Sequence, residues 1–136
     1  MIDKQNYYHG AALIEILEHA NCKQISKFDT GFAVNGNIFI FLKYTTKHRS
    51  PWRFTFSQSD IEYLDSLKGK SIFIALVCGG DGICSIKETE LKILITNKSG
   101  WVSAKRKFRE QYKVTGSNNE LTEKVSFKRW PNIIFE

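Results

Sequence analysis

The chain has 136 residues, of which 42% are hydrophobic and 13% aromatic, and its formal net charge is +6. These values predict one globular domain with a substantial core and exclude a disordered chain. No apolar run approaches the roughly 20 residues of a membrane helix, and the N-terminus lacks a signal-peptide pattern, so we expect a cytoplasmic protein. The three cysteines, Cys22, Cys78 and Cys84, form no CxxC motif and are interpreted as structural thiols.

The positive charge is concentrated in two segments. Residues 43–53 carry four cations and no acid, and residues 105–113 carry five cations and one acid, so each segment has a net charge of +4. Because the whole chain has a charge of +6, the remainder sums to −2. Local basicity of this kind favours an anionic partner. The alternative is that both segments are simply solvated basic loops.

The N-terminal part predicts a helix followed by a hairpin. Residues 7–20 carry a broad apolar stripe at helical spacing. Apolar residues in 23–34 recur with period two, which predicts one bent strand or two short ones. Asn35 and Gly36 are the strongest turn signal in the chain, because both central positions of a type I′ turn require positive φ. The turn leads into residues 37–46, whose first half is almost entirely apolar and predicts a strand buried on both faces.

The middle of the chain alternates between strands and helices. Residues 52–56 alternate as a half-buried strand, which we expect to join the first sheet. Residues 57–69 predict a helix with N-cap chemistry at its start and a glycine stop at its end. Residues 71–78 are a second very apolar strand, followed by a glycine-rich turn and a short return strand at 83–86. Residues 87–95 predict a third helix.

The tail is polar and basic. It predicts strands near 101–106 and 111–114, a turn at 115–119 and a return strand near 121–127. We therefore expect a single α+β domain over residues 1–136, with a mixed, mainly antiparallel sheet flanked by helices. Its core would span about residues 7–95, and residues 98–136 would form a basic, β-rich extension.

The predicted order over residues 7–78, a helix, three strands, a helix and a strand, resembles the αβββαβ core of the restriction-endonuclease-like superfamily. The resemblance implies a Mg²⁺-dependent nuclease with an aspartate on the second strand, an acid-x-lysine triplet on the third and often a helical glutamate. Asp29, Lys43 and Glu15 would be the catalytic residues, with Asp29 and Glu15 holding the metal. The triplet departs from this pattern, because Phe41 stands where the second acid belongs and Mg²⁺ requires hard oxygen ligands.

Four short segments are also similar to those of a group of small bacterial proteins of uncharacterised function, a likeness that implies no activity. They are Lys-Tyr-Thr-Thr-Lys (43–47), Ser-Pro-Trp-Arg-Phe-Thr-Phe (50–56), Leu-Val-Cys-Gly-Gly-Asp-Gly-Ile (76–83) and Tyr-Lys-Val-Thr-Gly-Ser (112–117). A nucleophilic enzyme has little support, because none of the three histidines lies in a motif with serine or cysteine.

Binding of nucleic acid requires fewer assumptions than catalysis. In the first basic segment, Lys47, Arg49 and Arg53 are suited to contact phosphates, with Trp52 available to stack on a base. The alternatives are that Trp52 and Trp101 pack in the core or at an edge, and that Arg53 pairs with an acid.

The second basic segment would extend this track. If it were a strand, three of its cations would share one face. The residues expected to bind are Lys105, Arg106, Lys107 and Arg109.

The sequence thus favours a domain that binds nucleic acid or another polyanion, with a degenerate nuclease core as a variant. The rival hypothesis is a non-enzymatic protein-interaction module, such as an immunity or anti-defence factor, whose basic loop meets an acidic protein surface. Salt-sensitive binding to nucleic acid would distinguish the first from the second.

Overall fold

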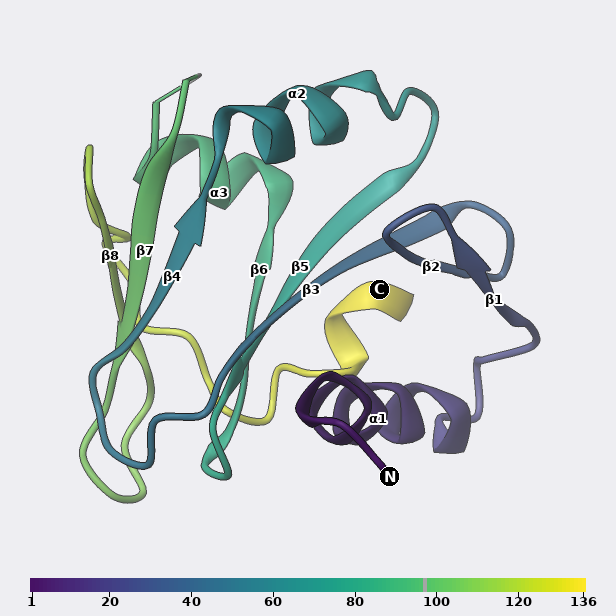
Figure 1. Cartoon of the computed structure of the whole chain (residues 1–136), viewed down its shortest axis with the longest axis horizontal. Coiled ribbons are helices and arrows are strands. Elements are labelled where there is room, and N and C mark those ends of the chain that lie inside the picture. The colour runs from purple at the N-terminus through teal and green to yellow at the C-terminus, as the bar shows by residue number, and fades with distance from the viewer. Residues whose placement is uncertain (97) are drawn as a thin grey trace.

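Two β-sheets packed face to face form the centre of the molecule (Figure 1). The computed structural model describes residues 1–96 and 98–136. In spatial order, the larger sheet contains β1 (Ile25–Phe28), β2 (Gly31–Val34), β3 (Ile38–Thr45), β5 (Ser71–Cys78) and β6 (Gly82–Lys87). The smaller sheet contains β4 (Trp52–Phe56), β7 (Gly100–Lys105) and β8 (Lys113–Gly116).

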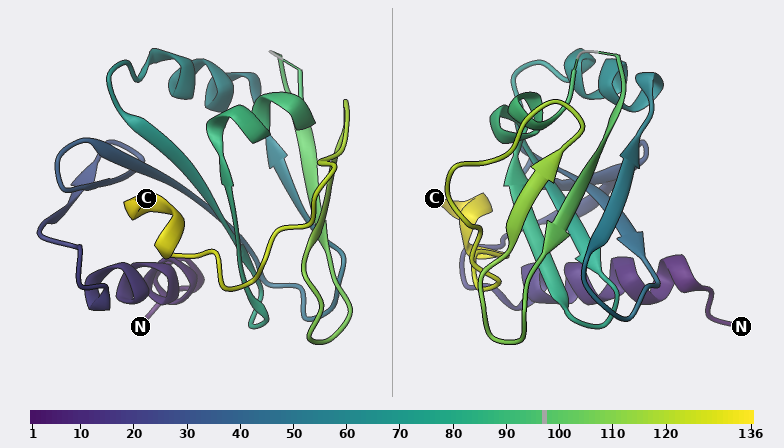
Figure 2. Two further views of the ribbon diagram at one scale, coloured as in Figure 1. Left: turned by 180° about the vertical axis from the view of Figure 1, so that it is seen from behind. Right: turned by 90° about the vertical axis from the view of Figure 1, so that its left-hand side faces the viewer.

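The helices are α1 (Lys4–Glu18), α2 (Gln58–Ser66), α3 (Glu88–Leu94) and the short 3₁₀ helix η1 (Asn132–Phe135). Helix α1 and η1 cover the outer face of the five-stranded sheet, whereas α2 and α3 lie where the two sheets diverge (Figures 1 and 2). All neighbouring strands are antiparallel except β3 and β5. The α+β class and the mainly antiparallel sheet structure expected from the sequence are confirmed.

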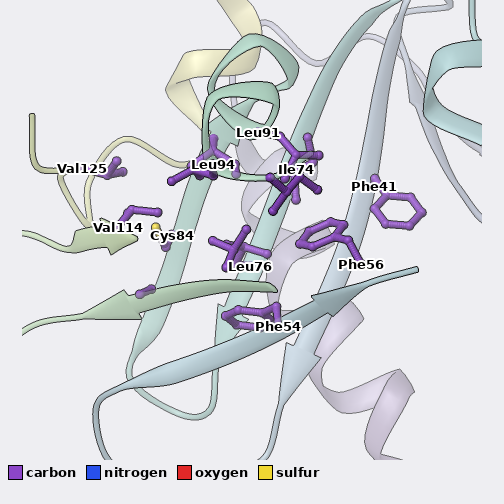
Figure 3. Packing of buried hydrophobic residues seen from close by; sticks show 14 of the residues in the cluster. Phe41, Phe54, Phe56, Ile74, Leu76, Cys84, Leu91, Leu94, Val114 and Val125 are labelled. Carbon is purple, nitrogen blue, oxygen red and sulfur yellow. The ribbon is translucent and has the colours of Figure 1, made fainter. Parts of the chain in front are cut away.

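Strands β3 and β5 are buried on both faces because their apolar runs have no polar side. Phe39 and Phe41 lie on the face covered by α2 and the three-stranded sheet, while Ile40 and Leu42 lie on the face covered by α1. The same alternation divides β5, so each strand contributes to two hydrophobic clusters. Figure 3 shows the cluster between the sheets, where Phe54 and Phe56 of β4 face Leu76 and Ile74 of β5.

Two local signals in the sequence are confirmed. Asn35 has a φ of 53° and Gly36 a φ of 82°, so both turn residues adopt the left-handed conformation and β2 folds back on β3. Ser57 caps α2: its side chain accepts a hydrogen bond from the Asp60 amide, and the Asp60 carboxylate accepts one from the Ser57 amide. This reciprocal capping box satisfies backbone donors that the first helical turn leaves unpaired.

The placement of β4 in the first sheet was wrong. Among the described residues, β4 pairs with β7, through the register Phe54↔Val102, and has no ladder with β3. A strand with one apolar face covers a sheet better than it extends one whose strands are buried on both faces, so β4 lies over that sheet.

The predicted return strand near 121–127 was also wrong. The structure shows only the isolated bridges Tyr112↔Val125 and Thr115↔Glu120 in this region. Residues 98–136 nevertheless supply buried side chains to the core, including Val102, Val114 and Val125. Among the helices of residues 1–96 and 98–136, none has both the length and the apolar character needed to cross a membrane.

We predict that Phe39→Ala lowers the free energy of unfolding by about 3–5 kcal/mol, because Phe39 is fully buried and packs against Phe28 and Tyr63. Phe73→Ala is the matched control. Phe73 lies on the same sheet but is only half-buried, so Phe73→Ala should lower the free energy of unfolding by clearly less. Urea-induced unfolding followed by circular dichroism measures both, and equal losses would contradict the described packing.

Candidate functional site

The two basic segments lie at the same end of the molecule. Trp52 of β4 pairs with Ala104 of β7, so the loop 46–51 before β4 meets the loop 106–112 after β7 (Figures 1 and 2). The Arg106 amide donates a hydrogen bond of 3.1 Å to Ser50 Oγ, which joins the loops directly. Segments of like charge, about fifty residues apart in sequence, are therefore held side by side.

The outer face of the three-stranded sheet carries cations, and its strands contribute no acid to it. Trp52, Phe54, Val102, Ala104 and Val114 face the core, and strand alternation turns their neighbours outward. None of the residues of β4, β7 and β8 is acidic. We call this outward surface the basic sheet face; it consists of Arg53, Thr55, Trp101, Ser103, Lys105, Lys113 and Thr115.

Like charges oppose each other on this face. Lys105 of β7 lies directly opposite Lys113 of β8, an arrangement that destabilises an antiparallel pair. Lys113 finds partial compensation in Glu120, whose Oε2 lies 4.0 Å from Lys113 Nζ. Both side chains of that ion pair are more than half exposed, so it contributes little to stability. The face therefore keeps a local excess of positive charge.

Arg53 and Trp101 form a pair at the centre of the basic sheet face. The Arg53 guanidinium lies 4.2 Å from the centre of the half-buried Trp101 ring, a cation–π contact. Within the described residues Arg53 makes no ion pair, so the alternative that it pairs with an acid does not hold there. Its donors remain available to a ligand.

The two joined loops present further exposed cations. We call this surface the basic tip; it consists of Lys47, His48, Arg49, Lys107, Phe108 and Arg109. The condition under which Lys105, Lys107 and Arg109 would share one strand face is not met, because β7 ends at Lys105 and Arg109 lies in a turn with a φ of 67°. Phe108, which sequence analysis missed, is 83% exposed, with the Arg109 guanidinium 5.1 Å from its ring centre.

Arg106 serves the fold rather than the surface. Its Nε donates to Asp81 Oδ2 at 2.7 Å, and its side chain is only 9% exposed. The Tyr112 hydroxyl donates to the same carboxylate oxygen at 2.9 Å. The hydrogen bond to Asp81 raises the pKa of Arg106. This cluster fastens the β5–β6 turn to the strands beneath the basic tip, so Arg106 is not available to phosphates.

Trp52 is also structural. It is 2% exposed, and its indole N–H donates a 3.0 Å hydrogen bond to the Lys47 carbonyl. The alternative of core packing is confirmed for Trp52, which cannot stack on a base. Its bond instead fixes the path of the loop that carries Lys47 and Arg49.

A cleft of about 630 Å³ adjoins the sheet face at Arg53. Asp29 and Lys43 both line it, together with Asp60 of α2. Lys43 Nζ lies 3.0 Å from Asp60 Oδ2, and Asp29 accepts a hydrogen bond of 3.0 Å from Tyr63. Burial by itself would raise the pKa of Asp60, but the Ser57 amide and Lys43 outweigh it, and the net pKa is lowered.

These residues do not fit a magnesium site. Glu15 lines a different cavity, beside Gly80 and Asp81, and so is not grouped with Asp29. Over the part of the chain that the structure describes, no three His, Cys, Asp or Glu side chains are grouped as metal ligands. Burial, with a smaller contribution from Glu18, raises the pKa of Glu15 and so disfavours its charged form. The nuclease resemblance itself stays a prediction.

The fold and site define an α+β protein with two packed sheets and a basic surface on the smaller one. Comparison with known proteins found no family model that matches the chain, no similar curated protein and no similar solved structure. The case for function therefore depends on the chain's own geometry.

We predict that Arg106→Ala lowers the free energy of unfolding by about 1.5–3 kcal/mol, because it removes a charged hydrogen bond from Asp81. Lys105→Ala, which removes an exposed cation from the adjacent position, should change stability by no more than about 0.5 kcal/mol. Chemical unfolding of both variants measures the difference. If Arg106→Ala leaves the free energy of unfolding unchanged, Arg106 has no structural role and is again a candidate for binding phosphates.

A second prediction concerns pH. Because the pKa of Asp60 is lowered in the folded state, its carboxylate stabilises the fold above the ordinary value of 3.8, and this stabilisation is lost as pH falls through the folded pKa. Asp60→Asn should therefore be less stable than the parent protein at neutral pH, with the gap closing in acid. Asp65→Asn, from the exposed pair with Lys92, should show little gap at either pH.

Proposed function

We propose that the protein binds nucleic acid, or a polyanion of similar charge density, through the basic sheet face and the basic tip. One observation carries this proposal: two distant segments of net charge +4 are brought together, and most of their cations remain unneutralised. In the described part of the chain, no ion pair is formed by Lys47, Arg49, Arg53, Lys105, Lys107 or Arg109.

The scaffold supports binding by rigidity. The sheet face is backed by a fully packed inter-sheet core, and the tip is held by the bonds of Trp52 and Arg106. Loops fixed on such a scaffold lose less conformational entropy when a ligand orders them. Phosphate contacts by lysine and arginine release counterions, so the affinity should fall steeply with salt.

The proposal is limited to binding because the carboxylates near the cleft are otherwise engaged. Asp60 is paired with Lys43, and Asp29 accepts from Tyr63. Arg53 belongs to the basic sheet face and also lines the cleft. A polyanion bound on that face would therefore reach the cleft at Arg53. The rival hypothesis, a protein-interaction module, uses the same cations against an acidic protein surface. It has no observation of its own that favours it over phosphates.

We predict that Arg49→Ala with Lys107→Ala weakens binding to labelled oligonucleotides and lowers the magnitude of the salt slope by about 1.4 for single strands, since each lost phosphate contact removes roughly 0.7. The matched control is Lys23→Ala with Lys68→Ala, which removes the same charge from exposed positions outside β4, β7 and β8. Fluorescence anisotropy at about 50 and 200 mM salt measures both slopes.

Equal losses in the two double variants would show that net charge, and not this surface, is responsible. If the parent protein binds no nucleic acid even at low salt, the proposal is wrong, and an acidic protein partner becomes the better hypothesis.

A further inference from the structure

We infer that the ligand of the basic sheet face is single-stranded nucleic acid, with one base stacked at the Arg53–Trp101 pair and another at Phe108. This inference rests on the proposed function and adds the class of nucleic acid to it. The cations alone would serve a duplex equally well, because a duplex presents phosphates to any basic surface. The two aromatic side chains are what distinguish the alternatives.

Exposed aromatic rings within a basic track are useful to a strand whose bases are free. In a duplex the bases are stacked inside, and their flat faces are out of reach, whereas single strands offer a π-face at every base. Trp101 lies within the basic sheet face and Phe108 within the basic tip. β7 itself has no acid, and Phe108 is flanked on both sides by cations, although Glu110 follows Arg109.

The Arg53–Trp101 pair has a geometry suited to a base. The guanidinium covers the indole at 4.2 Å without a carboxylate partner in the described residues. A guanidinium plane and an indole plane are both stacking surfaces for bases, and the edge of the guanidinium also donates to phosphate. Arg53 and Trp101 are not directly opposite, since the register pairs Arg53 with Ser103 and Thr55 with Trp101. The arginine therefore reaches diagonally to cover the ring.

Phe108 has no role in the fold that would explain it. It is 83% exposed and belongs to neither hydrophobic cluster of the core. It stands between Lys107 and Arg109, so any base stacked on it would have cations on both sides for its phosphates. A base stacked on Phe108 would bury this exposed apolar ring, which favours the contact.

The distance between the two positions sets the length of strand that can reach both. Trp101 and Lys105 are four residues apart on β7, about 13 Å, and Phe108 lies in the turn beyond the end of that strand. This is several times the spacing of about 3.4 Å between neighbouring stacked bases, so the two contacted bases are not adjacent nucleotides. A single strand that touches both rings would run along β7, with the intervening phosphates passing Lys105.

The three tryptophans give a direct reporter. Trp52 is 2% and Trp130 is 4% exposed, whereas Trp101 is half-buried on the surface. A base that stacks at Trp101 should quench intrinsic fluorescence, and the quenching should disappear in Trp101→Leu. Inorganic polyphosphate, which has the charge but no bases, should bind without this quenching.

The experiment compares three labelled or competing probes: single-stranded oligothymidylate, the oligothymidylate–oligoadenylate duplex and inorganic polyphosphate. We expect Trp101→Leu to lower affinity for the single strand by about 5- to 150-fold, the usual effect of losing one base–aromatic stack. Its affinity for the duplex and for polyphosphate should be unchanged. Phe108→Leu should act in the same direction without touching the core, and Arg53→Lys should keep the charge but lose part of the single-strand affinity.

Phe108→Leu and Arg53→Lys keep the test decisive if Trp101→Leu folds poorly, because both alter exposed side chains. Equal affinity of the parent protein for single strand and duplex, with no effect of Trp101→Leu or Phe108→Leu, would overturn the inference and leave the polyanion surface intact. Failure to bind all three probes would overturn the proposed function as well.

Discussion

The packing of the three-stranded sheet against β3 and β5 determines the surface on which binding is proposed. Phe54 and Phe56 enter the inter-sheet core, and strand alternation then leaves Arg53 and Thr55 no other direction than solvent (Figure 3). The same constraint turns Trp101, Lys105 and Lys113 outward from β7 and β8. A shift of one residue in register would bury the cations and expose the core, so apolar burial enforces the charged face.

The cations of this protein divide by what lies beneath them. Arg106 and Lys43 border the core and meet acids, Asp81 and Asp60, because a partly buried charge without a partner is costly. Arg49 and the other cations of the basic tip stand over solvent and need no partner for stability. The fold does not require the charge of these tip cations. Their grouping in one place is therefore better explained by a role in binding than by stability.

The sequence predicted most elements and fewer of the site's contacts. Apolar runs predicted β3 and β5, and residues 71–78 match β5 at both ends. The alternation in 52–56 predicted that Arg53 faces outward, but not that β4 pairs with β7, because pairing over about fifty residues leaves no local signal. Trp52 was misassigned for the same reason: burial of an aromatic residue at a strand end depends on what folds over it.

The proximity of 43–53 and 105–113 could not be predicted, since strand pairing alone creates it. Phe108 could have been found, because it lies between two cations in a gap between predicted strands, where no core position is expected. The opposed pair of Lys105 and Lys113 is a second feature that stability does not explain. Opposed lysines destabilise the strand pair slightly, and the exposed Glu120 offsets only part of that cost, so the fold gains nothing from placing them together.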